Sequence, residues 1–132
     1  MPKTIQHAVR FSASPGQLFN IYMDSRKHSA AIQAEAVISR KVGTKFAAHD
    51  GWISGKNIAI VPGRMIVQSW RGADWKKRDV DSILILTFSR VRDGGQITVV
   101  HANVPDQWHV RLSKGWNTHY WNRWRAYLKR RR

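Results

Sequence analysis

The sequence predicts an α+β fold in which a long C-terminal helix lies across a curved antiparallel sheet. Residues 35–103 read as strands separated by glycine-containing turns, and beyond Pro105 the apolar pattern changes to a helical period. A length of 132 residues, with 42% hydrophobic residues and seven tryptophans, fits one folded domain with one core. We expect this domain to cover residues 1–128 and a basic tail to cover residues 129–132.

The N-terminal quarter predicts one strand and two short helices. Apolar side chains alternate with polar ones over residues 4–11, as in a half-buried strand. Ser14-Pro15 then supplies an N-cap and a first-turn proline for a helix. A second short helix is expected to begin near Asp24-Ser25.

The middle of the chain predicts a meander of antiparallel strands. The best strand patterns cover residues 65–71, 83–90 and 96–104. Turns are indicated at Gly43, Asp50-Gly51, Pro62-Gly63 and Asp93-Gly94-Gly95. These connections are short, and short connections favour hairpins over crossovers.

Beyond Pro105, large apolar residues recur at steps of three and four. Trp116, Tyr120, Trp124 and then Tyr127 or Leu128 form one stripe on a helix from about Ser113 to about Lys129. Such a helix is about 25 Å long at about 1.5 Å per residue, which is enough to cross a sheet of this size. We expect the stripe to pack against the inner face of the meander.

Several short motifs between Gly51 and Trp121 occur in a characteristic order. They are Gly51-Trp52-Ile53-Ser54-Gly55-Lys56-Asn57, Val61-Pro62-Gly63, Ile66-Val67-Gln68-Ser69-Trp70-Arg71, Trp75, Leu86-Thr87-Phe88, Asn103-Val104-Pro105, Gly115-Trp116 and Tyr120-Trp121. As a set they resemble the C-terminal domain of the activator of heat shock protein 90 ATPase homologue family, within the START and birch-pollen-allergen-like (SRPBCC) superfamily. The resemblance implies the helix-grip fold, which has the same element order as the pattern predicts.

The resemblance also implies a cavity between the long helix and the sheet, which various relatives use for lipids, hormones or polyketides. It implies no catalytic residues, and it suggests a chaperone-linked, stress-response role. Full-length activators resemble a two-domain chain whose separate N-terminal domain makes essential chaperone contacts, and 132 residues cannot hold it. We therefore do not expect this chain to stimulate a chaperone directly.

Large apolar side chains from the helices and the sheet are expected to line the ligand cavity. Its predicted lining is Phe19, Phe46, Gln68, Trp70, Leu84, Leu86, Phe88, Thr98, Val100, His101, Trp116, Tyr120 and Trp124. Tyr120, Gln68 and Thr98 are the candidates for its few polar groups. Large aromatic side chains are also core filler, so the sequence leaves open whether the cavity is open or filled. It also leaves open whether His101 orients a ligand or is a surface or edge residue.

Charge is the unusual feature of the composition, because 23 lysines and arginines against 8 acidic residues give a formal charge of +15. A field of this size predicts nonspecific attraction to polyanions. The expected basic surface comprises Lys76, Lys77, Arg78, Arg123, Arg125, Lys129, Arg130, Arg131 and Arg132. Aromatic residues such as Trp121 interleave with it, which suggests base stacking, but no motif of a known RNA- or DNA-binding domain is present.

Catalytic and metal motifs are absent from the sequence. There is no cysteine, and the six histidines show neither the i, i+4 pair nor the His-Glu-x-x-His motif of a zinc site. His49 and Asp50 are neighbours, and as strand residues they would face opposite sides and be poor acid-base partners. Gly51–Lys56 is one residue short of a phosphate-binding loop, and we expect a hairpin connection there. No metal or other cofactor is expected.

The leading hypothesis is a nonenzymatic helix-grip domain that binds a small apolar ligand or a protein partner in or near the cavity. Three alternatives stay open: a chaperone-linked co-chaperone, a polyanion-binding protein, and a cyclase-like enzyme that uses Tyr120 or His101 as acid or base. The N-terminus lacks a secretory signal and no long apolar run is present, so we expect a cytoplasmic protein without a membrane span. The sequence leaves the ligand, the pathway and the oligomeric state open.

Overall fold

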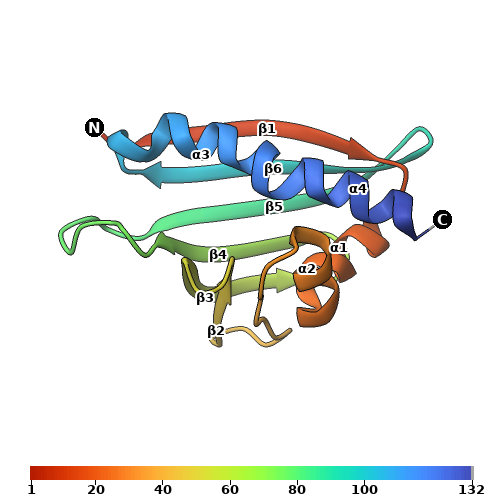
Figure 1. Cartoon of the computed structure of the whole chain (residues 1–132), viewed down its shortest axis with the longest axis horizontal. Coiled ribbons are helices and arrows are strands. Elements are labelled where there is room, and N and C mark those ends of the chain that lie inside the picture. The colour runs from red at the N-terminus through yellow and green to blue at the C-terminus, as the bar shows by residue number, and fades with distance from the viewer. Residues whose placement is uncertain (132) are drawn as a thin grey trace.

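Residues 1–131, which the computed structural model describes, form a six-stranded antiparallel sheet with the helices on one of its faces (Figure 1). The elements are β1 (Lys3–Phe11), α1 (Pro15–Met23), α2 (Ser25–Ile32), β2 (Lys45–Ala48), β3 (Ile53–Val61), β4 (Met65–Gly72), β5 (Ser82–Val91), β6 (Gly94–Val104), η1 (Asp106–Trp108), α3 (His109–Gly115), η2 (Trp116–Trp121) and α4 (Asn122–Arg130). The strand order is β1-β6-β5-β4-β3-β2. The predicted fold class and the meander are confirmed.

The two short helices begin at the predicted residues because side chains cap them. Ser14 Oγ accepts a hydrogen bond from the Gln17 amide at 3.1 Å, and Gln17 Oε1 accepts one from the Ser14 amide at 2.8 Å. This reciprocal pair is a capping box, and it satisfies two backbone donors that would otherwise lack partners. Asp24 caps α2 through one such bond, in which its Oδ1 accepts from the Lys27 amide at 2.9 Å.

The sheet buries the side of each strand that faces the helices. On β4 these residues are Ile66, Gln68 and Trp70. On β6 the alternation buries Ile97, Val99 and His101 and leaves Thr98 and Val100 half-buried on the opposite face. The prediction that Thr98 and Val100 line the cavity is therefore wrong.

The C-terminal helical segment is longer than predicted, because its first turns begin at Asp106 instead of near Ser113. Its middle part, η2, is a π-helix, in which the Asn122 amide bonds to the Asn117 carbonyl five residues earlier. The wider turn brings both Tyr120 and Trp121 to the inner face, where they are 3% and 0% exposed. The predicted stripe is buried, and Trp121 belongs to it.

Trp121 and Trp124 fill the space between the C-terminal half of this helix and the sheet. Their rings lie 6.1 and 5.9 Å from the Phe11 ring, and Trp121 stacks on Trp116 at 5.6 Å. Because both rings are fully buried, neither can stack on a nucleic-acid base. Within residues 1–131, no helix is long and apolar enough to cross a membrane.

Candidate functional pocket

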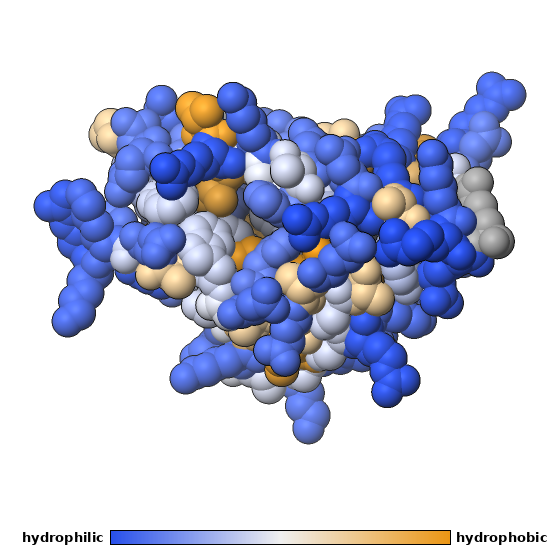
Figure 2. All heavy atoms as spheres, in the orientation of Figure 1, coloured by the Kyte–Doolittle hydropathy of each residue, from blue (hydrophilic) through white to orange (hydrophobic). Residues whose placement is uncertain are grey.

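A pocket of about 410 Å³ lies between the N-terminal half of the long helix and the β2–β3 end of the sheet. Its lining consists of His49, Trp52, Ile53, Trp70, Trp108, Arg111, Leu112, Gly115, Trp116, His119 and Tyr120. Figure 2 shows mainly hydrophilic side chains on this face of the molecule, with apolar atoms recessed among them. The volume and the apolar lining are typical of a site for a small molecule.

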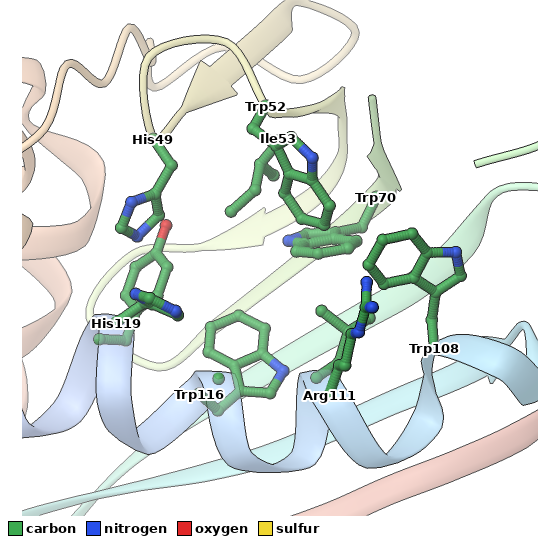
Figure 3. A pocket seen from close by; sticks show the side chains of 11 residues that line it. His49, Trp52, Ile53, Trp70, Trp108, Arg111, Trp116 and His119 are labelled. Carbon is green, nitrogen blue, oxygen red and sulfur yellow. The ribbon is translucent and has the colours of Figure 1, made fainter. Parts of the chain in front are cut away.

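Aromatic rings form the walls of the pocket. The Trp52 ring lies 6.2 Å from Trp70 and 5.5 Å from Trp108, and the Trp116 ring lies 6.1 Å from Trp70 and 4.9 Å from Tyr120. These rings come from the β2–β3 turn, from β4 and from two parts of the C-terminal helical segment, η1 and η2 (Figure 3). Elements far apart in the sequence therefore converge on one apolar space.

Three of the predicted cavity residues line this pocket, namely Trp70, Trp116 and Tyr120. Phe19, Phe46, Leu84, Leu86, Phe88 and Trp124 are buried core residues away from it. Gln68 is also buried, and both ends of its amide are used: Oε1 accepts from the Tyr22 hydroxyl at 2.8 Å, and Nε2 donates to Asn57 Oδ1 at 2.9 Å. Gln68 is thus part of a closed internal network and is not a free polar group of the pocket.

His101 is fully buried behind the pocket wall, so it is neither a surface nor an edge residue. Its Nδ1 accepts from Trp116 Nε1 at 3.2 Å, which places the ring proton on Nε2, where Ser82 Oγ lies at 2.8 Å. Burial lowers the pKa of His101 to about 3. His101 therefore stays neutral and positions Trp116, and it does not reach the pocket.

Tyr120 reaches the pocket through its ring, while its hydroxyl bonds to a second buried histidine. The hydroxyl lies 3.0 Å from His28 Nε2, and His28 Nδ1 lies 2.8 Å from the Tyr22 carbonyl. Since a carbonyl only accepts, His28 carries its proton on Nδ1 and accepts from Tyr120. Burial lowers the pKa of His28 to about 4 and raises the pKa of Tyr120 well above its ordinary value. Both groups are therefore neutral near pH 7.

His49 and His119 form one end of the pocket, and neither was predicted as a pocket residue. His49 and Asp50 lie in the turn between β2 and β3, with φ of 50° and 59°, so the expectation that they are strand neighbours is wrong. The His49 ring lies 5.7 Å from His119 and 5.2 Å from Tyr120. Burial, with smaller contributions from His119 and Arg123, lowers the pKa of His49.

The predicted basic residues do not form one continuous surface. Lys76, Lys77 and Arg78 are exposed in the β4–β5 connection, and Arg125, Lys129, Arg130 and Arg131 are exposed on or after α4. Arg123 is half-buried and donates to the Ile32 carbonyl at 2.6 Å. Arg132 lies outside the described residues.

A metal centre has no support in residues 1–131, which contain no cluster of three or more histidine, cysteine or acidic side chains in ligating positions. His28 and Tyr120 bond to each other, and His101 bonds to Ser82 and Trp116.

The chain matches curated proteins over most of its length. It is 31% identical over 117 residues to the activator of 90 kDa heat shock protein ATPase homolog of Dictyostelium discoideum. It is 27% identical over 110 residues to homolog 1 of Homo sapiens. These alignments cover 86% and 83% of this chain but 30% and 32% of the relatives, so the chain spans about a third of their length.

Solved structures share the fold. An HSP90 activator from Plasmodium falciparum has a TM-score of 0.80 at 24% identity, with 89% of each chain covered. The Aha1 dimer from Colwellia psychrerythraea has a TM-score of 0.76 at 12% identity, with 89% of this chain and 90% of that chain covered. The family model for "Activator of Hsp90 ATPase homolog 1-like protein" matches residues 12–129. The chain therefore belongs to the activator of Hsp90 ATPase homologue family and has its helix-grip fold.

Proposed function

We propose that this chain is a nonenzymatic helix-grip domain that binds a small, largely apolar molecule in the tryptophan-lined pocket. The observation that carries the proposal is the pocket itself, which has a volume of about 410 Å³. Trp52, Trp70, Trp108 and Trp116 line it. Aromatic walls give a flat apolar ligand a large contact area, and a pocket that exists before binding avoids the entropic cost of ordering one.

The chemistry of the titratable groups supports a binding role over a catalytic one. A general base needs a pKa near the working pH, and burial moves the pKa of His28 and His101 far below it. The raised pKa of Tyr120 keeps its hydroxyl protonated, and that proton is donated to His28. His101, one of the two acid-base candidates from the sequence, is outside the pocket.

A pocket-filling variant tests the proposal without removing any core side chain. Gly115 lines the pocket and has helical dihedrals, with φ of −61°, and an added Cβ would meet only His119 Cδ2 at 3.6 Å. Gly115→Leu therefore places four carbon atoms at the pocket wall at no cost to the backbone conformation. Gly16→Leu is the matched control, because Gly16 lies on α1 away from the pocket and an added Cβ meets nothing within 4 Å.

Two measurements on the purified protein decide the outcome. Native mass spectrometry looks for a co-purified small molecule, and titration with the neutral probe 2-naphthamide is followed by tryptophan fluorescence and saturation-transfer NMR. We expect binding by the wild type and Gly16→Leu and a loss of at least about tenfold in affinity for Gly115→Leu, since the inserted side chain takes the ligand's volume. Equal affinities for all three proteins, or neither a bound molecule nor probe binding, would refute the proposal.

Family membership favours a second candidate, which is a contact with the Hsp90 chaperone. The curated relatives are named as activators of the 90 kDa heat shock protein ATPase, and the match covers most of this chain. Binding and ATPase assays with the Hsp90 of the same organism test this candidate, with a full-length activator as positive control. Binding without stimulation is the expected result for a domain that spans about a third of those relatives. Absence of binding at concentrations where the full-length activator saturates the chaperone would exclude this role.

A further inference from the structure

Apart from Tyr120, the ionisable side chains that line the pocket are all basic. Of the described residues, its lining contains one permanent cation, Arg111, together with His49 and His119, and no carboxylate. The acidic side chain next to it, Asp74, accepts a hydrogen bond from Trp52 Nε1 at 2.9 Å and is not part of the lining. Because the whole chain carries a formal charge of +15, its overall field has the same sign as the pocket.

Arg111 contacts an aromatic ring at the pocket, and it pairs with no acidic side chain of residues 1–131. Its guanidinium lies 5.0 Å from the centre of the Trp108 ring, and none of the ion pairs among residues 1–131 includes it. Figure 3 shows Arg111 pointing from α3 toward the side of the pocket where Trp70 and Trp108 lie. A guanidinium that is stacked in this way keeps its planar fork of donors available for a carboxylate.

Two buried ring nitrogens in the lining also lack protein partners. Trp70 Nε1 and His49 Nε2 are inaccessible to solvent and bond to no group of the described chain. Most buried polar atoms in folded proteins have a partner, and an indole nitrogen can only donate. Because solvent does not reach these two nitrogens, they do not open onto the space of the pocket, and the permanently charged side-chain donors that the pocket offers to an anion are those of Arg111.

We propose that the pocket binds a planar aromatic molecule with one anionic group, such as an aromatic carboxylate, with its ring among Trp52, Trp70 and Trp116 and its anionic group at Arg111. This inference rests on the proposed function and names the class of ligand. A neutral ligand of the same shape makes the same ring contacts. The difference in affinity between the anionic and the neutral ligand therefore measures the contribution of Arg111.

The test compares two probes of nearly equal shape, 2-naphthoate and 2-naphthamide, by isothermal titration calorimetry at about 150 mM salt, where the general field of the surface is screened. We expect the wild type to bind 2-naphthoate about threefold to tenfold more tightly than 2-naphthamide, since Arg111 is exposed to solvent on one side. Arg111→Gln removes this preference and leaves the affinity for 2-naphthamide within about twofold. Lys114→Gln, which removes an exposed cation from the same helix outside the pocket, keeps the preference.

The possible failures are distinguishable. Equal affinities of the wild type for both probes overturn the inference and leave the proposed function standing. A preference for 2-naphthoate that survives Arg111→Gln, or binding of 2-naphthoate that survives Gly115→Leu, assigns the effect to the charged surface and also overturns the inference. Binding of neither probe overturns the inference, and it overturns the proposed function as well when native mass spectrometry finds no co-purified molecule.

Discussion

Two buried neutral histidines should make this protein lose stability in mild acid. Burial lowers the pKa of His28 to about 4 and that of His101 to about 3, from an ordinary value of 6.5. Below pH 6.5 the unfolded chain takes up protons at these positions that the folded chain does not. The free energy of unfolding is therefore highest above pH 6.5 and falls as the pH drops toward 4 for His28 and toward 3 for His101.

The size of the loss follows from these values. At pH 5 the unfolded imidazole is almost fully protonated and the folded one is not, which costs about 2 kcal/mol for each histidine relative to pH 8. The two together cost about 4 kcal/mol, a large part of the roughly 5–15 kcal/mol that stabilises a domain. Lowered pKa values of His7 and His49 act in the same direction.

Urea unfolding followed by tryptophan fluorescence at several values between pH 8 and pH 5 measures this loss. The window excludes the two aspartates with shifted pKa values, Asp24 and Asp106, because their ordinary value is 3.8 and their folded values are lower. His28→Gln and His101→Gln should each reduce the dependence on pH by about 2 kcal/mol, even though each lowers stability at pH 8. A stability that stays constant from pH 8 to pH 5 would show that these histidines are solvated or charged in the folded protein.

The remaining predictions concern packing, hydrogen bonding and surface charge. Gly55→Ala should lower stability by more than about 2 kcal/mol or prevent folding in a thermal melt, because the added Cβ would lie 1.8 Å from the Ser69 carbonyl oxygen; an unchanged melting temperature would contradict this. Gly115→Ala should instead raise the free energy of unfolding by about 0.5–1 kcal/mol, because alanine favours a helix over glycine. Gln68→Leu should lower the free energy of unfolding, measured by urea denaturation, by about 1–3 kcal/mol, since the buried Tyr22 hydroxyl loses its acceptor. Binding of single-stranded DNA, measured by fluorescence anisotropy, should fall at least tenfold between about 50 and 200 mM salt and show no sequence preference; affinity that persists would indicate a specific site.

The element order could be predicted because its determinants are local in the sequence. Ser14 and Pro15 mark the start of α1 through a cap and a fixed φ, and they do so in the structure. Glycine turns mark the ends of strands in the same way, as at Gly51 and Gly63, where φ is 89° and 74°. The C-terminal helix carries its aromatic residues in one stripe, and burying that stripe requires the helix to lie against the sheet.

The face of β6 could not be predicted because both faces of the sheet carry apolar residues. Val67, Ile85 and Val100 pair across three neighbouring strands on the outer face, where they are half-buried. Strand periodicity identifies the inner face only when polar residues occupy the other one. In this part of β6, valines stand at both 99 and 100, so the alternation contains no information about which one is inside.

The sequence left open whether a pocket exists, and only three of the residues that line it were identified, because its walls depend on contacts between distant segments. His49 and Trp52 come from a turn, and Trp108 comes from the short helix η1. Neither the turn nor η1 has a periodic pattern of apolar residues that would assign a side chain to one face. The extension of the helical segment back to Asp106, which the sequence did not indicate, is what carries Trp108 and Arg111 to the pocket.

The position of the pocket along the helix follows from two adjacent features, Gly115 and the π-helix that begins at Trp116. At the end of the wide turn and in the helix that follows, Trp121 and Trp124 point inward and fill the space against Phe11. At Gly115 the helix has no side chain, and His49 and Trp52 of the β2–β3 turn line the same pocket. An aromatic stripe alone predicts core and cavity equally well, and the missing side chain decides between them. For this reason a single side chain at position 115 should close the pocket without disturbing the packing of the other half of the helix.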